Sequence, residues 1–378
     1  MTSPIPFNHA SVVGSEVAYV NEVIRIAHFS GDGPFTKKCH GLLEEVLGVP
    51  RVLLTTSCTH ALEMAALLLN CGPGDEVIIP SFTFVSTANA FAVRGARPVF
   101  IDIHPATLNL DETLLEAMIT PRTRAVVPVH YAGVACAMDR IQDIAARHGI
   151  AVVEDNAHGL FGSYRGKPLG TFGALATLSF HETKNIVCGE GGALLVNDEG
   201  LMERAEIIRE KGTNRSRFFR GLIDKYTWVD LGSSYLPSEL LAAFLYGQLE
   251  QRGRIQAARK RIWEYYHEHL RSWADRNGVR LPVVPEGCVQ PYHLYYLLAP
   301  TLASRQGLMQ HLRSRGIASV FHYLQLHLSA MGMKFGGKPG DCPVTEDVSD
   351  RLLRLPFYFA LTEEDQARVV SAVQEYRF

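Results

Sequence analysis

The sequence predicts an α/β protein whose mostly parallel sheet is covered by helices on both faces, followed by a smaller α+β unit. Between about residues 50 and 200, short β-rich runs alternate with helical patterns, which is typical of consecutive strand–helix units. The predicted strands are continuously apolar, as expected of strands buried on both faces. After residue 245 this alternation stops. We therefore expect a large domain over residues 1–248 and a small C-terminal domain over residues 249–378.

The elements follow from the apolar patterns in chain order. The large domain has runs typical of strands at residues 51–54, 77–80, 98–103, 125–129, 150–154, 175–180 and 193–196. Its helical patterns lie at residues 59–69, 112–119 and 137–148. The first of these, THALEMAALLL, is apolar on all sides and is expected to be buried. The small domain is expected to have helices at 249–272, 302–315, 344–354 and 363–375, and strands at 294–299 and 319–323.

Composition excludes several classes of protein. The net charge of -2 gives no electrostatic reason to expect nucleic acid or an anionic membrane as a partner. Seven cysteines without a CxxC pair argue against a complete disulfide framework, and we expect no metal site. The start, MTSPIPFNHASVV, has no signal-peptide pattern. No apolar run approaches the roughly 18 residues of a membrane span. A cytoplasmic protein is expected.

Polar clusters follow directly after five of the predicted strands. They lie at residues 55–59, 81–84, 130–133, 155–158 and 179–185. In open α/β sheets, ligands bind outside the carboxyl ends of the strands. We therefore expect these five loops to form a pocket at one edge of the sheet.

The hydroxyl-rich cluster TTSCT, residues 55–59, stands between a strand and a helix. The first backbone N–H groups of a helix have no intrahelical partner, so such a position binds phosphate. The alternative is plain N-capping by Thr56 or Ser57, which is the commoner use of such residues.

The strand IAVVED ends in two carboxylates, Glu154 and Asp155. A buried carboxylate needs a partner, and a protonated ring nitrogen would be one. A metal or a helix N-terminus would satisfy a carboxylate equally well, so this motif alone leaves the ligand open.

Lys184 lies in SFHETKN, directly after an apolar strand and just before CGEGG. Close backbone packing is expected around the glycines, so the amine would be desolvated, have a lowered pKa and form a Schiff base with an aldehyde. A phosphate site, an acid for a ring nitrogen and a Schiff-base lysine are the three features that bind pyridoxal 5'-phosphate (PLP). The sequence therefore predicts a PLP enzyme.

Beyond these features, long motifs carry a family resemblance. They are GDGPFTKKCHGLLEEVLG, SCTHALEMAALLL, GDEVIIPSFTFVSTANA, PVHYAG, VVEDNAHG, SFHETKN, GEGGALLVND and LGSSYLPSELLAA. Over essentially its whole length the chain resembles the DegT/DnrJ/EryC1/StrS nucleotide-sugar aminotransferases. This family has the PLP-dependent transferase fold type I, the aspartate aminotransferase-like fold. PSFTFVSTANAF, VPVHYAGVAC and REKGTNRSRFFRG further resemble the branch that aminates C4 of dTDP-4-keto-6-deoxyglucose, which includes the dTDP-4-amino-4,6-dideoxygalactose transaminases.

The resemblance implies catalytic and cofactor-binding roles for individual residues. Lys184 matches the Schiff-base lysine, and Asp155 matches the acid that keeps the pyridine nitrogen protonated. The phosphate is expected to lie on Ser179 and on the amides of Cys58 and Thr59.

Further cofactor and substrate contacts carry over less directly. Phe84 matches an aromatic ring that stacks on the cofactor, and His158 stands where the family often has Gln beside the phenolic oxygen. Ser234 replaces an Asn that reaches the phosphate of the partner subunit, and Leu236 replaces the usual Arg. The remaining expected contacts are with the sugar nucleotide: His322 and His327 near the sugar, and Arg215, Arg217 and Arg220 of the basic loop KGTNRSRFFR near the diphosphate. A solvated loop is the alternative for these three arginines.

The expected reaction is PLP-dependent transfer of an amino group from L-glutamate to a nucleotide-linked 4-keto-6-deoxy sugar. With dTDP-4-keto-6-deoxy-D-glucose, the products are a dTDP-4-amino-4,6-dideoxyhexose and 2-oxoglutarate. The family builds its sites across two subunits, so a homodimer is expected. The alternatives are a C3 aminotransferase and a non-catalytic regulatory protein of the same fold. A nicotinamide enzyme lacks its GxGxxG turn here, and the related 3-dehydratases carry histidine in place of Lys184.

Overall fold

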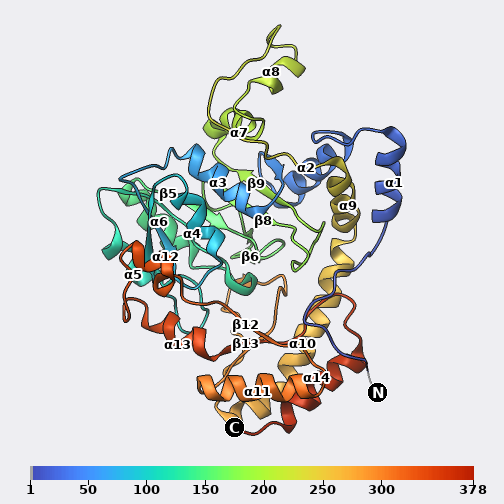
Figure 1. Cartoon of the computed structure of the whole chain (residues 1–378), viewed down its shortest axis with the longest axis vertical. Helices are drawn as coiled ribbons and strands as arrows, with labels where there is room; N and C mark the ends of the chain where they lie inside the picture. The colour runs from blue at the N-terminus through green and yellow to red at the C-terminus, as the bar shows by residue number, and fades with distance from the viewer. Residues whose placement is uncertain (1–2) are drawn as a thin grey trace.

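Seven strands form a central sheet in the order β1-β9-β8-β5-β4-β2-β3 in the computed structural model, which describes residues 3–378 (Figure 1). Six of them run parallel, and β9 lies antiparallel between β1 and β8. Their bounds are β1 Val52–Thr55, β2 Glu76–Pro80, β3 Arg97–Ile101, β4 Thr123–Val126, β5 Ala151–Asp155, β8 Leu175–Ser179 and β9 Gly192–Val196. All seven strands were expected from the sequence, and the predicted mostly parallel sheet is confirmed.

Helices cover both faces of this sheet because successive strand residues point to opposite sides. Leu53 packs into the cluster of α3, whereas its neighbours Val52 and Leu54 pack into the cluster of α2 and α9 on the other face. Because both faces of the strands are covered, the strands read as continuous apolar runs in the sequence. The helices of this part are α1 Glu16–Ile26, α2 Pro34–Leu47, α3 Cys58–Leu68, α4 Val85–Ala92, α5 Glu112–Met118, α6 Met138–His148, α7 Met202–Arg209, α8 Arg215–Phe219 and α9 Glu239–Glu250.

A second, smaller body follows, with a three-stranded antiparallel sheet in the order β11-β13-β12. Figure 1 shows it in orange and red below the large sheet. Its core contains Tyr266, Trp273 and Tyr295 together with Ile5 from the other end of the chain. Its elements are α10 Arg252–Asn277, β11 Tyr296–Leu298, α11 Leu302–Ser314, β12 Val320–Phe321, α12 Ala330–Lys334, α13 Pro343–Arg351, β13 Leu352–Arg354 and α14 Glu363–Glu375. The predicted domain boundary after residue 248 falls inside α9 and stays a prediction.

The helix expected at residues 344–354 is wrong at its end. The helix α13 stops at Arg351, and residues 352–354 form β13, the central strand of the small sheet. A short apolar run such as LL does not distinguish a helix from a buried strand. Pro356 also disfavours helical backbone at the residue before it.

The N-terminal segment crosses from the large body to the small one. Ile5 pairs with Ile317, and the carbonyl of Phe7 accepts a hydrogen bond from the amide of Phe357 at 3.3 Å.

Short elements complete the structure: a small sheet of β6 Ser163–Tyr164, β7 Lys167–Pro168 and β10 Cys288–Val289, and the 3-10 turns η1 Tyr131–Gly133, η2 Glu199–Leu201 and η3 Leu326–Leu328. Within residues 3–378, no helix has both the length and the apolar character needed to cross a membrane.

Candidate active site

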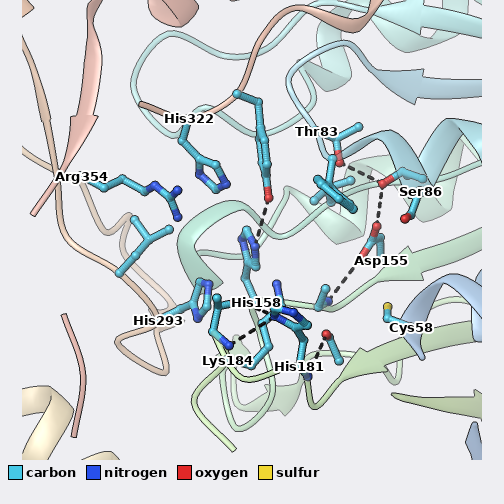
Figure 2. A pocket seen from close by; sticks show the side chains of 18 of the residues that line it. Cys58, Thr83, Ser86, Asp155, His158, His181, Lys184, His293, His322 and Arg354 are labelled. Carbon is cyan, nitrogen blue, oxygen red and sulfur yellow. Dashed lines mark hydrogen bonds between the residues drawn. The ribbon is translucent and has the colours of Figure 1, made fainter. Parts of the chain in front are cut away.

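A cavity of about 720 Å³ opens at the carboxyl ends of β1, β5 and β8, between the large and the small body (Figure 2). Four of the five predicted loops contribute to its wall: those at residues 55–59, 81–84, 155–158 and 179–185. The loop at 130–133 does not line it, and this part of the prediction is wrong. Its side chains are buried in the protein, where His130 bonds to Glu154.

Lys184 lies on the cavity floor in the loop between β8 and β9 (Figure 2). The loop is held by its own backbone: Phe180 N donates to Gly191 O at 2.8 Å, and Lys184 N donates to His181 O at 2.9 Å. Burial lowers the pKa of the Lys184 amine to about 8, since the charged form loses its hydration. The side chain therefore offers a neutral, nucleophilic amine at mildly basic pH.

Asp155 ends β5 and presents a buried carboxylate to the same cavity. Its Oδ2 accepts a hydrogen bond from the Thr87 hydroxyl at 2.8 Å, and its Oδ1 accepts one from the Ala157 amide at 3.2 Å. Burial raises the pKa of this carboxyl group, and the two hydrogen bonds oppose the rise. A cation arriving from the cavity would stabilise the ionised form further.

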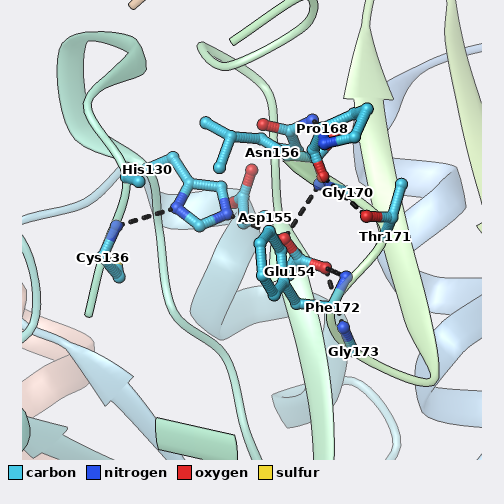
Figure 3. A network of polar contacts seen from close by, with 12 residues as sticks. His130, Cys136, Glu154, Asp155, Asn156, Pro168, Gly170, Thr171, Phe172 and Gly173 are labelled. Atoms are coloured by element: carbon cyan, nitrogen blue, oxygen red, sulfur yellow. Dashed lines mark hydrogen bonds and ion pairs between the residues drawn. The ribbon is translucent and has the colours of Figure 1, made fainter. Parts of the chain in front are cut away.

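The neighbouring carboxylate, Glu154, points to the other face of the strand and is wholly engaged by protein (Figure 3). Its two oxygens accept from the amides of Gly170, Phe172 and Gly173 at 2.6–2.8 Å and from His130 Nε2 at 2.9 Å. His130 Nδ1 accepts from the amide of Cys136 at 3.2 Å, so its proton is on Nε2. Glu154 is therefore structural, and Asp155 is the carboxylate of this motif that is open to a ligand.

The start of α3 faces the cavity with Ser57, Cys58 and Thr59. Ser57 is the N-cap, because its Oγ accepts from the amide of His60 at 3.1 Å. Capping leaves the amides of Cys58 and Thr59 at the open helix end. Ser179 of β8 also lines this part of the cavity. A helix N-terminus flanked by hydroxyl groups is suited to a phosphate.

Gly192 explains the close packing predicted around CGEGG. A Cβ at this position would lie 2.4 Å from the amide nitrogen of Cys58. The absence of a side chain lets β9 run directly against the start of α3. The glycine thereby fixes the helix end next to the loop that carries Lys184.

Imidazole rings form the next layer of the cavity. His158 stacks on His293 with ring centroids 4.2 Å apart, and its Nε2 shares a hydrogen bond of 3.3 Å with the Tyr323 hydroxyl. Its Nδ1 is buried and has no partner among the described residues. Burial holds the pKa of His158 well below its usual value, so the ring is neutral. Phe84, 57% exposed, lies nearby with its ring centroid 6.3 Å from that of Tyr323.

The two histidines expected at the sugar lie in different places. His322 lines the cavity, and its Nδ1 shares a hydrogen bond of 3.1 Å with the Tyr131 hydroxyl. His327 is fully buried outside the cavity lining, between Ser81 Oγ at 2.6 Å and Glu346 Oε1 at 3.0 Å. Both of its ring nitrogens are engaged, so the predicted sugar contact by His327 finds no support in this position.

The expected diphosphate contacts and Ser234 lie away from the cavity of their own chain. The helix α8, which projects at the top of Figure 1, carries Arg215 and Arg217. Each arginine of this loop pairs with a glutamate: Arg215 with Glu210, Arg217 with Glu203, and Arg220 with Glu206. Ser234 is exposed on the segment before α9. For all four residues, a role in a site shared with a second subunit stays a prediction.

Sequence reasoning missed Thr87, His293 and Arg354, which all line the cavity. Thr87 could have been found, because it follows Phe84 by three residues and would lie on the same side of a helix. Arg354 was hidden by the helix expected over residues 344–354. His293 lies near the β11 strand of the small body, where the sequence gives no sign that its loop returns to the large sheet.

The residues present fit PLP at four separate points. The helix end accommodates a phosphate, Lys184 supplies an amine, and Asp155 supplies a buried acid. The orphaned Nδ1 of His158 adds a buried polar atom that a ligand oxygen would satisfy.

Comparisons with known proteins agree with this geometry. The model of the DegT/DnrJ/EryC1/StrS aminotransferase family matches residues 11–374. GDP-perosamine synthase of Caulobacter vibrioides is 33% identical over 374 residues, which cover 96% of this chain and 95% of the relative. Two solved structures are similar over 98% of both chains: the aminotransferase TlmJ from Streptoalloteichus hindustanus, with a TM-score of 0.90 and 31% identity, and Spr1654 from Streptococcus pneumoniae in its PLP form, with a TM-score of 0.91 and 26% identity.

These findings confirm the predicted family, fold type and cofactor, whereas the finer assignment to the dTDP-4-keto-6-deoxyglucose branch stays a prediction. The chain belongs to the DegT/DnrJ/EryC1/StrS aminotransferase family and is a PLP-dependent sugar aminotransferase.

Proposed function

We propose that the enzyme transfers the amino group of L-glutamate to C4 of dTDP-4-keto-6-deoxy-D-glucose, giving a dTDP-4-amino-4,6-dideoxyhexose and 2-oxoglutarate. The observation that carries the chemistry is one cavity in which Lys184, with an amine pKa of about 8, faces the buried carboxylate of Asp155. The choice of C4 and of the dTDP sugar rests on the motifs PSFTFVSTANAF, VPVHYAGVAC and REKGTNRSRFFRG.

Lys184 has two tasks in this proposal. With PLP bound, its amine would hold the cofactor aldehyde. Once free, the amine would be placed to take a proton from the donor Cα as general base and to return it as general acid. A pKa of about 8 suits this alternation, because both protonation states are populated near neutral pH.

Asp155 and His158 act on the cofactor ring without reacting. When bound, PLP supplies an electron sink for the bond that is broken at the donor Cα. Asp155 would keep the ring nitrogen protonated, and its hydrogen bonds from Thr87 and Ala157 keep the carboxylate oriented. His158 is neutral, so its free Nδ1 serves as a hydrogen-bonding group and not as a second cation.

A homodimer belongs to this proposal. The segment around α8 exposes large apolar side chains, among them Phe219 at 69% and Trp228 at 73%. Such residues favour burial against another surface. A second copy would bring Ser234 and the arginines of this loop to the partner's cavity. Light scattering is expected to give twice the chain mass of 41.9 kDa, and a monomeric active enzyme would contradict the shared site.

The test is to supply the purified PLP-loaded enzyme with L-glutamate and dTDP-4-keto-6-deoxyglucose, and to identify the amino sugar by NMR. We expect 2-oxoglutarate and an amine at C4 in equal amounts. A GDP-linked 4-keto sugar is the rival acceptor, since GDP-perosamine synthase is among the relatives. Preference for the GDP sugar, or an amine at C3, would overturn the assigned substrate.

A further inference from the structure

Arg354 lies at the end of the central strand of the small sheet, with its guanidinium group beside His322 in the cavity wall (Figure 2). Alternate residues of a strand share a face. Leu353 packs into the core of the small body, whereas Leu352 packs with Phe82 of the large body. Arg354 shares the face of Leu352 and is thereby directed at the cavity.

The guanidinium group is under-satisfied. One Nη2 contact reaches the carbonyl of Phe321 at 3.3 Å, and the group lies 4.7 Å from the centre of the Phe7 ring. Its Nε is buried and has no partner among the described residues. Within residues 3–378, no carboxylate lies within ion-pair distance of Arg354. A guanidinium offers five N–H donors in a planar fork, so most of its capacity remains for a ligand.

The charge of Arg354 affects titratable groups elsewhere in the cavity. It contributes to the lowered pKa of Lys184, His158 and His322, although burial is the main cause for all three. Burial also lowers the pKa of Arg354 itself. Arg354 is half-buried, and a cation held there without a counter-charge is costly, so a bound anion would reduce that cost.

An α-amino acid donor brings at least one carboxylate into this cavity. Among the described lining residues, Lys184 and Arg354 are the two with lysine or arginine side chains, and Lys184 must react as a neutral amine. We infer that Arg354 binds a carboxylate of the amino-acid donor through its guanidinium fork and thereby orients the donor amine toward Lys184. The inference rests on the proposed function in one respect, that the donor is an amino acid.

The diphosphate of the sugar nucleotide is a second source of anionic oxygens. A donor carboxylate is favoured because Arg354 lines the same cavity as Lys184, where the donor reacts, whereas the arginines expected at the diphosphate do not line it. Carboxylate and phosphate oxygens both match the geometry of the guanidinium fork, so the choice rests on the position of Arg354.

The test is a pair of half-reactions with the PLP-loaded protein, followed by its absorbance, in the wild type and in Arg354→Gln, Arg354→Lys and the control Arg315→Gln. Arg315 is an exposed arginine of the same body, paired with Glu375. We expect Arg354→Gln to raise the half-saturating glutamate concentration at least about tenfold, since a charge-assisted contact is lost. The half-saturating glutamate concentration of Arg354→Lys should lie between those of the wild type and Arg354→Gln. The control Arg315→Gln should match the wild type. The half-saturating sugar nucleotide concentration should change less than about twofold.

A second measurement is independent of turnover. Succinate, a dicarboxylate that cannot react, is titrated calorimetrically into each PLP-loaded protein. Weaker succinate binding by Arg354→Gln than by the wild type is expected, and equal binding or no binding by either overturns the inference. If Arg354→Gln changes only the half-saturating concentration of the sugar nucleotide, the inference is also overturned, and Arg354 is assigned to the diphosphate. If the wild type forms no 2-oxoglutarate from glutamate, the proposed donor fails, while the succinate comparison still decides the role of Arg354.

Discussion

The two sides of the active-site cavity are built from different kinds of strand. The floor stands on β1, β5 and β8, strands of four or five residues in a sheet covered on both faces, and carries Lys184 and Asp155. The wall opposite belongs to β12 and β13, strands of two and three residues in a small antiparallel sheet, and carries His322 and Arg354. We expect the long, covered strands of the floor to hold groups in the fixed positions that bond making requires. We expect the wall to contact the incoming molecule. Floor variants should therefore lower kcat with every substrate, and wall variants should change KM for particular ones.

The largest effect is expected from Lys184→Ala. Loss of the amine removes both cofactor anchorage and proton transfer, so turnover should fall on the order of 10⁴-fold or more. The absorbance band that depends on the covalent bond between Lys184 and the cofactor should vanish as well. Lys260→Ala, which changes an exposed lysine of α10, is the control. Retained turnover in Lys184→Ala would remove the lysine from the mechanism.

Asp155→Asn should be the next most damaging change. The amide has nearly the same shape but carries no charge to stabilise a protonated ring nitrogen, so kcat should fall about 10²- to 10³-fold while the cofactor still binds. Stopped-flow absorbance with L-glutamate measures this step. Asp143→Asn on the surface of α6 should leave it unchanged. An unaltered rate constant in Asp155→Asn would contradict the proposed electrostatic role.

The pKa of Lys184 predicts a pH dependence of cofactor capture. The neutral amine is the reactive form, so capture of PLP by the cofactor-free protein should be fastest above about pH 8. Below that pH the neutral fraction falls by a factor that approaches tenfold per unit, which gives about a 50-fold loss between pH 8 and pH 6. A free lysine side chain, measured alongside as the reference, should have its midpoint near 10.4. A protein midpoint at that same value would show that burial does not tune this amine.

Thr87→Val tests how much the floor depends on residues behind it. The change removes the hydroxyl that donates to Asp155 while keeping the side-chain volume. We expect kcat to fall about tenfold, because the ionised carboxylate loses a hydrogen bond. Thr87→Ser should restore most of the rate. Equal rates for the valine and serine variants would show that the hydroxyl has no part in orienting Asp155.

Tyr323→Phe changes a side chain of the cavity wall and should have the smallest effect. It removes the 3.3 Å hydrogen bond to His158 Nε2 without emptying the space. We expect KM for the sugar nucleotide to change about two- to fivefold, with kcat nearly constant. A fall in kcat larger than that of Thr87→Val would reverse the proposed division between floor and wall.

The same contrast explains what could be predicted from the sequence. The floor follows rules that act locally: buried strands read as continuous apolar runs, and the polar residues after them meet at one sheet edge. All seven sheet strands and the cavity positions of Lys184, Asp155 and Ser179 were expected on that basis or by resemblance. The roles assigned to these residues remain predictions.

The wall depends on packing between segments that are far apart in the chain. Arg354 was placed on a helix, since LLRLP carries no period that reveals a three-residue strand. His327 was expected in the cavity because its segment resembles one near the sugar. The turn η3 instead places its ring between Ser81 and Glu346. A hydrogen bond between residues 246 positions apart has no local signature.

The segment at residues 5–9 has a practical consequence. Ile5 pairs with Ile317, Phe7 and Asn8 line the cavity, and the Phe7 ring lies beneath Arg354. One short segment, residues 5–8, therefore both packs against the small body and lines the cavity. An affinity tag or fusion partner joined close to this segment is expected to perturb the Phe7–Arg354 contact in the cavity wall, so the opposite terminus is the better attachment point for purification and immobilisation.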